Sequence, residues 1–289
     1  YTNTADNNTA VGRSALYANT TGAGNTAVGL NSLAANTTAA EQTAVGYAAL
    51  AASTTGQSNT AVGYGTLDAN TTGEQNVGIG AWALSANTTA SANVAVGNNA
   101  LDANTTGANN VGVGKDALGA NTTGYSNIAI GSSSLATNTT SFHNTAIGLE
   151  ALNSNTTGYS NIAIGNLALD ANTTASNSVA VGYNALGANT TGAQLVAIGR
   201  DALTANTTAS YNVAVGDSCL AANTTGHSNV AMGYAAMDAI TTGSEAVAIG
   251  AYALTAASGS SNVAVGFKAG EDVSTGTNNI FLGKETGRS

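Results

Sequence analysis

The chain has 289 residues, of which 7% are charged, none is proline and 36 are glycine, and its formal net charge is −9. Neutralising the phosphates of a nucleic acid requires clustered lysine and arginine, and only six such residues are spread along the chain. No apolar run approaches the ~20 residues of a membrane-spanning helix. We therefore expect neither nucleic acid nor membrane insertion.

One short motif, N-[TVI]-A-[VI]-G, recurs along the whole chain. Every step is 17 residues except the one from Ala246 to Asn262, which is 16. The unit reads N-V-A-V-G-x-x-A-L-x-A-N-T-T-G-x-x, and its positions are numbered one to seventeen below. The copies begin at Asn8, Asn25, Gln42, Asn59, Asn76, Asn93, Asn110, Asn127, Asn144, Asn161, Ser178, Leu195, Asn212, Asn229, Ala246, Asn262 and Asn279.

Within each unit, the V-A-V segment alternates with the period of a strand, and the later L-x-A segment does the same. A helix would need apolar residues at spacings of three and four over ten or more residues, whereas A-L-x-A offers one turn between glycine and N-T-T. The sequence predicts an all-β fold, a parallel β-solenoid or β-roll of 17-residue coils with two short strands per coil. Residues 1–289 then form a single solenoid of about 17 repeats, which we expect to be a segment of a longer fibre.

Equivalent positions of such a solenoid stack at about 4.8 Å, the spacing of neighbouring strands. Glycine at position five permits a corner with positive φ or close packing. Asparagine at position twelve is expected to hydrogen-bond to its counterparts above and below. The predicted structural ladders comprise Val11, Val28, Val45, Val62, Ile79, Val96, Val113 and Ile130 at position four, Leu16, Leu33 and Leu50 at position nine, and Asn19, Asn36 and Asn70 at position twelve.

The sequence leaves open which side chains of the first strand point into the coil. Positions two and four point to one side and the alanine of position three to the other. If alanine faces the interior, the Val/Ile face points outward and another chain must cover it. If Val/Ile faces inward beside the leucine of position nine, a monomeric solenoid suffices.

The groups that carry chemistry are scattered. His143 and His227 occupy corner positions without the convergent carboxylates or thiols of a triad or metal site. Cys219 stands where other copies carry alanine or serine, which predicts a small buried residue. We expect no enzyme activity, no catalytic or metal site and no cofactor. We interpret the four aspartates of position ten as solvated surface charges. They are Asp68, Asp102, Asp170 and Asp238.

Aromatic residues gather at the corners. They include Tyr47, Tyr64 and Tyr183 at position six, Trp82 at position seven, and Tyr125 and Tyr159 at position sixteen. One interpretation is packing that covers the corners. The other is a stripe for binding glycans, because aromatic faces offer apolar area beside a polar tip.

Threonine pairs fill positions thirteen and fourteen in the first fourteen copies, from Thr20-Thr21 to Thr241-Thr242. Adjacent residues of an extended chain point to opposite sides, so one rank of threonines should face outward. A regular threonine array can order surface water, which makes ice binding the alternative function. The N-T-T triplets are also formal glycosylation sequons, but their fixed register favours structural ladders.

The strings Asn93-Val94-Ala95-Val96-Gly97 and Asn127-Ile128-Ala129-Ile130-Gly131 resemble the head repeats of trimeric autotransporter adhesins of the YadA type. The longer form, with A-L-x-x-N-T-T-G, is similar to repeats of phage tail-fibre and bacterial surface proteins. The resemblance implies a left-handed β-roll assembled as a homotrimer, and an extracellular place on a cell surface, fibre or virion. We therefore expect a structural or adhesive fibre module, such as a surface adhesin or a tail-fibre shaft. Its expected partners are further copies of itself, in a homotrimer or stacked end to end, and host or surface glycans.

Overall fold

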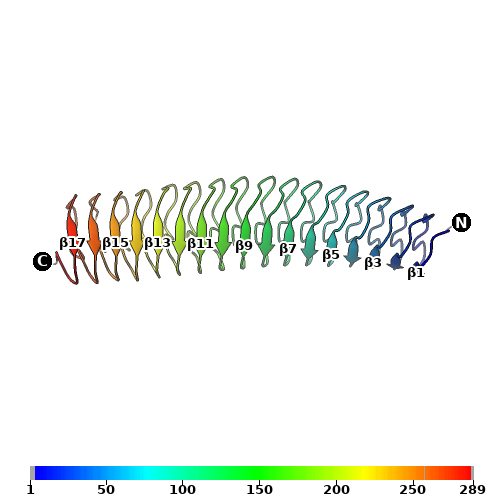
Figure 1. Ribbon diagram of the computed structural model, residues 1–289, viewed down its shortest axis with the longest axis horizontal. Coiled ribbons are helices and arrows are strands. Elements are labelled where there is room, and N and C mark those ends of the chain that lie inside the picture. The colour runs from blue at the N-terminus through cyan, green and yellow to red at the C-terminus, as the bar shows by residue number, and fades with distance from the viewer. Residues whose placement is uncertain (1–3, 257, 288–289) are drawn as a thin grey trace. The chain divides into compact units, whose positions relative to one another are not determined.

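The structure, a computed structural model, describes residues 4–256 and 258–287. It is an all-β parallel β-solenoid in which each repeat forms one coil with one three-residue strand, and these described ranges contain no helix (Figure 1). The coils fall into two compact units, Tyr1–His143 (unit 1) and Asn144–Ser289 (unit 2).

Unit 1 contains eight strands, each paired in parallel with the next. Equivalent positions of the repeat face one another, as Thr43 faces Thr60 and Val45 faces Val62. The sheet twists along the stack, since β1 and β7 present different faces to the viewer in Figure 1. The strands are β1 (Thr9–Val11), β2 (Thr26–Val28), β3 (Thr43–Val45), β4 (Thr60–Val62), β5 (Val77–Ile79), β6 (Val94–Val96), β7 (Val111–Val113) and β8 (Ile128–Ile130).

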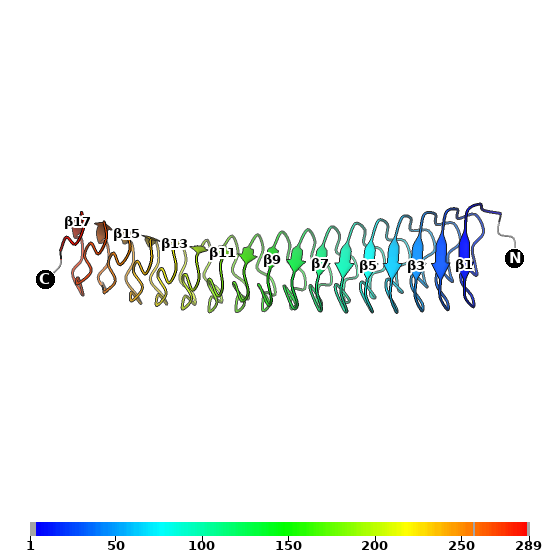
Figure 2. The ribbon, with the colours of Figure 1, turned by 90° about the horizontal axis from the view of Figure 1, so that it is seen from below.

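Unit 2 repeats this arrangement with nine strands. Val196 faces Val213 and Ile198 faces Val215, again one coil apart. Figure 2 shows the strands of this unit turning gradually from β9 to β17. The strands are β9 (Thr145–Ile147), β10 (Ile162–Ile164), β11 (Val179–Val181), β12 (Val196–Ile198), β13 (Val213–Val215), β14 (Val230–Met232), β15 (Val247–Ile249), β16 (Val263–Val265) and β17 (Ile280–Leu282).

The second strand predicted at positions nine to eleven does not form. Leu50 at position nine and Ala48 at position seven have φ values of 51° and 54°, in the left-handed region. These residues still hydrogen-bond to neighbouring coils, but in opposite directions along the stack. The Leu50 amide donates to the carbonyl of Thr66 at 3.1 Å, and the Ala48 amide to that of Leu30 at 2.9 Å. The prediction of two strands per coil is therefore wrong: one strand is followed by a hydrogen-bonded leg of turns.

The glycine of position five fits its predicted role at the corner. Gly165 has a φ of 136°, and a Cβ atom built on it would lie 2.3 Å from the carbonyl oxygen of Gly182 in the next coil. Any side chain would thus meet both backbone strain and a backbone clash. The repeated glycine lets the coils approach to hydrogen-bonding distance at this corner.

The core is thin and consists of stacked small and medium side chains. The predicted leucine ladder lies inside, with Leu33 and Leu50 fully buried and Leu16 nearly so. The alanine of position three, as at Ala44 and Ala61, is also fully buried. This decides the question left open by the sequence: alanine faces the interior, and positions two and four face outward.

Two asparagine ladders hold the coils together, of which the sequence indicated one. At position twelve, the Asn87 Nδ2 donates to Asn70 Oδ1 at 2.8 Å, and the Asn36 Nδ2 donates in the same way to Asn19. At position one, the Asn76 amide nitrogen donates to Asn59 Oδ1 at 2.9 Å. The Nδ2 groups of Asn76 and Asn87 both donate to the carbonyl of position fifteen. Buried amides satisfied in this way fix the spacing of the coils.

Two departures from the repeat are compensated by a neighbouring residue. Where Ser53 replaces the asparagine of position twelve, the longer Gln42 at position one reaches it, and its Nε2 lies 2.8 Å from the serine Oγ. Gly270 replaces the leucine of position nine, and a Cβ there would lie 2.9 Å from the ring of Phe281. Phe281 thus stands at position three, where most copies have alanine, and its ring lies beside Gly270, which leaves the space of the missing leucine.

Candidate functional surface

The most extended apolar feature of the protein is formed by the side chains of positions two and four, which we name the outward strand face. In unit 1, Ile79 is 41% exposed, while Ala44 between two outward residues is completely buried. The predicted ladder from Val11 to Ile130 therefore lies on the surface and not in the core. Because neighbouring strands are in register, these side chains form a continuous strip within the unit.

In unit 2 the outward strand face is apolar at both positions from β10 onward. Ile164 and Ile198 are 38% and 40% exposed, and Met232 and Ile249 are similar. The eight strands β10–β17, at about 4.8 Å spacing and each with two outward residues about 7 Å apart, give a strip of roughly 270 Å². An apolar patch of this size is comparable to the largest one on a typical monomer, which is often functional.

The first four strands of unit 1 differ at position two. Thr9, Thr26, Thr43 and Thr60 stand where every later strand except β9, which has Thr145, carries valine or isoleucine. The pairing register is the same in both cases. Threonine offers a methyl group and a hydroxyl, so β1–β4 present a mixed face, whereas β5–β8 of the same unit are apolar at both outward positions.

One edge of the outward strand face, beyond the corner glycine, carries a cluster of three aromatic rings. Tyr47 and Tyr64 stack with their ring centroids 4.8 Å apart and their planes within 9°. Trp82 packs edge-on against Tyr64 at 4.9 Å. One face of Tyr47 and one face of Tyr64 meet within this cluster, and all three residues remain partly exposed.

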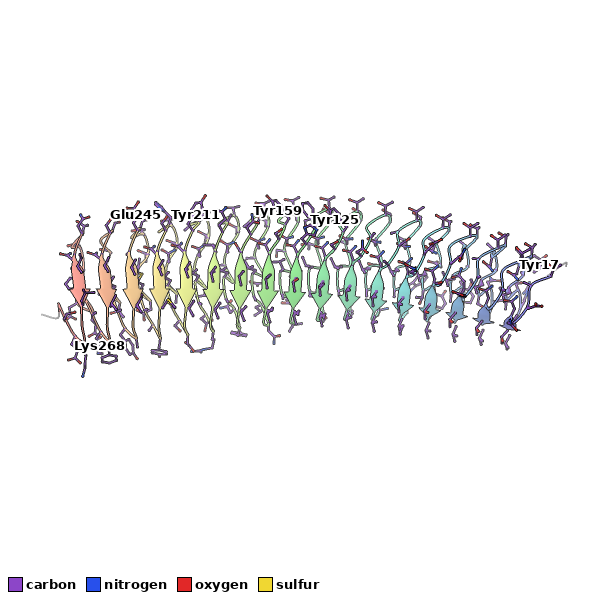
Figure 3. All side chains as sticks on the ribbon, in the orientation of Figure 1. Tyr17, Tyr125, Tyr159, Tyr211, Glu245 and Lys268 are labelled. Carbon is purple, nitrogen blue, oxygen red and sulfur yellow. The ribbon has the colours of Figure 1, made fainter. Side chains whose placement is uncertain are left out.

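The opposite edge carries the aromatic residues of positions sixteen and seventeen. In unit 1, Tyr125 and Phe142 stack at 5.0 Å, and His143 stands perpendicular to both rings. In unit 2, Tyr159 and Tyr211 lie along one edge, whereas Lys268 lies at the other (Figure 3). Of the predicted surface residues, the structure thus brings together Tyr47, Tyr64 and Trp82, and it places Tyr125 in a separate cluster.

A further aromatic cluster lies in unit 2, and the sequence did not indicate that its three rings are in contact. Tyr252 lies between Tyr234 and Phe267, with centroid distances of 5.3 and 6.2 Å. The Lys268 ammonium stands 5.5 Å from the Tyr252 ring centroid and 2.9 Å from a carboxylate oxygen of Glu271. The available signal was the occurrence of aromatic residues at positions six and seven of consecutive coils.

The four aspartates of position ten, interpreted as solvated surface charges, are half-buried. Burial raises the pKa of each carboxyl, because removal from water disfavours the charged form. Cys219 is completely buried, as predicted, and its burial raises the thiol pKa to about 12. Within residues 4–256 and 258–287, no cluster of three or more histidine, cysteine or acidic residues has the geometry to hold a metal ion.

The threonine ranks divide as expected. At position thirteen the side chain is half-buried in most coils, and the Thr71 Oγ1 donates to the carbonyl of Thr88 at 3.0 Å. At position fourteen, as at Thr72 and Thr89, the side chain is exposed. The asparagine of each N-T-T triplet is buried and bonded, as at Asn87, so the sequons are inaccessible in the folded coil.

The fold and surface define a tandem-repeat β-solenoid protein with an outward apolar strip. No protein-family model matches the chain, and a search of curated proteins found no match. In the part of the chain that the structure describes, no helix has the length and apolarity to span a membrane.

Proposed function

We propose that this chain is a structural and adhesive module of an extracellular fibre, of the kind found in surface adhesins and tail-fibre shafts, and that it associates with itself. The observation that supports this proposal is the orientation of the strand. Alanine fills the interior, while valine and isoleucine point into solvent on successive coils, as at Ile164 and Ile198.

Folding by itself does not require these outward residues to be apolar. Thr26, Thr43 and Thr60 occupy position two with the same strand register as the valines of later coils. The repeated use of valine and isoleucine in β10–β17 therefore needs another cause. Covering by a second copy is such a cause, since the strip recurs at every coil and is complementary to itself.

The energetic scale is compatible with association. Burying the strip of one unit on each of two chains would contribute on the order of 15 kcal/mol at about 25 cal/mol per Å². Association costs about 4–15 kcal/mol in lost freedom. The free energy gained by burial exceeds the cost of association only when most of the strip is apolar. A homotrimer is the arrangement that the resemblance to adhesin heads implies, and end-to-end stacking is the rival.

Glycans of a host or surface are the proposed adhesive partner. The aromatic clusters at the corners supply exposed apolar edges and hydroxyls, and Tyr183 is 53% exposed. Glycan-array binding tests this, with Tyr183→Ala and Tyr47→Ala as variants. Binding to the array that persists unchanged in both variants would remove these residues from the proposal.

The fibre function is tested by electron microscopy of the whole chain. We expect elongated particles that associate side by side, and separate particles for the variant with Ile164→Lys and Ile198→Lys. Two substitutions at the exposed Thr72 and Thr89, also to lysine, provide the matched control. If the wild-type particles never associate, the proposal fails.

Ice binding is the second candidate, favoured by the exposed rank of threonines at position fourteen. Wild-type protein should then show thermal hysteresis, and Thr72→Lys with Thr89→Lys should reduce it. Absence of hysteresis at high protein concentration would discard this function and leave the fibre proposal untouched.

A further inference from the structure

Tyr47 and Tyr64 form a stacked pair of phenol rings. Both residues occupy position six of consecutive coils, and their rings lie 4.8 Å apart with planes 9° from parallel. The side chains are 45% and 48% exposed, so small oxidants and protein oxidants can reach the phenol groups. Two phenols are therefore held side by side at an accessible corner.

The backbone keeps these two side chains together. The Gly63 amide donates to the carbonyl of Val45 at 2.8 Å, and the Gly65 amide donates to that of Tyr47 at 2.9 Å. These hydrogen bonds flank Tyr64 and tie its backbone directly to the coil that carries Tyr47. Bringing the two rings together thus needs no further ordering of the chain, whereas an unfolded chain would have to close a loop of 17 residues.

We infer that Tyr47 and Tyr64 form a site of oxidative cross-linking to dityrosine by a haem peroxidase with hydrogen peroxide. The enzyme takes one electron and one proton from each phenol hydroxyl, and hydrogen peroxide is reduced to two water molecules. The two tyrosyl radicals then form a carbon–carbon bond between ring carbons ortho to the oxygens. The hydrogen on each of these carbons moves to the phenolic oxygen, which restores both hydroxyls, and the protein has lost two hydrogen atoms.

Two other tyrosine sites provide internal comparisons. Tyr234 and Tyr252 are close, at 5.3 Å, but their rings are 78° apart and therefore nearly perpendicular. Tyr183 is more exposed than Tyr47, yet its neighbours at position six of the adjoining coils are Asn166 and Arg200. Selectivity for one pair thus distinguishes stacking from mere exposure.

The link would fasten two consecutive coils covalently in a chain whose only cysteine is buried. It closes a loop in the unfolded state, as a disulfide does, and so should raise the temperature of thermal unfolding. This inference does not depend on self-association or adhesion, because both tyrosines belong to one chain.

The test treats dilute whole protein with a haem peroxidase and hydrogen peroxide, followed by thermolysin digestion and mass spectrometry. We expect a linked peptide pair containing Tyr47 and Tyr64, lighter than the sum of its parts by two hydrogen atoms, while the intact chain keeps its monomer mass in a denaturing gel. Tyr64→Phe retains a ring for stacking and should lose this peptide pair completely. Tyr183→Phe is the matched control and should retain it.

The same reaction in denaturant supplies the second comparison. The native chain should give several-fold more of the Tyr47–Tyr64 link than the denatured chain. Equal yields in the two states would overturn the inference. So would links that follow exposure alone, with Tyr183 and Tyr211 joined between chains in preference to the stacked pair.

Discussion

The outward strand faces of β1–β4 and of β10–β16 share one backbone and differ in one position. In both regions the alanine of position three is inside and the strands pair in register. Position two is threonine in β1–β4 and valine or isoleucine in β10–β16. The difference shows that the coil tolerates a polar side chain there, and covering of the face by further copies is our proposed reason for the apolar choice in β10–β16.

The interior shows the opposite behaviour. Leu50 in unit 1 and Leu186 in unit 2 are both fully buried, and the corner glycine recurs in every coil. Inside the coil each residue type is set by stacking on its copies. On the outside of the coil, the residue type varies from copy to copy.

The largest expected effect comes from a substitution inside the coil. Leu50→Ala and Leu186→Ala should each lower the free energy of unfolding by about 3 kcal/mol, because each leaves a cavity in a thin core. Since the two interiors are alike, the losses should agree within about 1 kcal/mol. Urea denaturation followed by circular dichroism measures them. Losses below about 1 kcal/mol would show that the leucine ladder is not the core.

The next effect comes from charges on the apolar part of the face. Ile164→Lys together with Ile198→Lys should abolish self-association, because an uncompensated ammonium cannot be buried in the interface. The free energy of unfolding should change by less than about 0.5 kcal/mol per site, as it does for substitutions at other surface positions. Sedimentation velocity reports the association. Thr26→Lys with Thr43→Lys is the matched control in the mixed region, and equal effects of the two pairs would remove the distinction between the regions.

A smaller effect is expected from the reverse change. Thr26→Val, Thr43→Val and Thr60→Val extend the apolar strip through β2–β4, and each should favour association by about 1 kcal/mol. The combined variant should remain associated at lower concentration than the wild type in a dilution series. If its dissociation occurs at the same concentration, β2–β4 lie outside the interface.

The smallest effect concerns the half-buried aspartates. Burial, and to a lesser degree the charge of Glu150, raise the pKa of Asp170 above its ordinary value of 3.8. The folded state therefore binds a proton more readily than the unfolded state, so the contribution to stability is full below 3.8 and is lost as the pH rises through the folded-state pKa.

Asp170→Asn should accordingly raise the melting temperature slightly at pH 7, and this gain should vanish below about pH 3.8. Asp217 supplies the opposite sign, because the hydrogen bond from Arg200 lowers its pKa. Asp217→Asn should lower the melting temperature at pH 7. A gain for Asp170→Asn that is the same at both pH values would contradict the burial argument.

Much of the coil follows from the sequence because stacking repeats every constraint. The strand at positions two to four, the corner at position five, the leucine ladder and the asparagine ladder at position twelve are confirmed. The turn leg was missed because leucine has no preference for positive φ. The conformation of this leg is held by hydrogen bonds to both neighbouring coils, from the Leu50 amide to the carbonyl of Thr66 and from the Ala48 amide to that of Leu30.

The surface was predicted in part. The sequence predicted that aromatic residues lie at the corners. It did not predict which rings are in contact or which ring faces are covered. Tyr47 and Tyr64 stack because both occupy position six of the repeat. Trp82 occupies position seven, and its contact with Tyr64 depends on the local path of the chain. The asparagine ladder of position one was not predicted, because an asparagine directly before a strand is also typical of a strand boundary. The strand orientation could not be predicted, because alternation alone fits either face.

The central claim, that the outward strand face is covered by further copies of the chain, is tested most directly by native mass spectrometry of the wild-type protein over a range of concentrations. We expect the mass of a homotrimer that falls to the monomer mass in the variant with Ile164→Lys and Ile198→Lys. A folded wild-type protein that remains strictly monomeric at high concentration would contradict the claim.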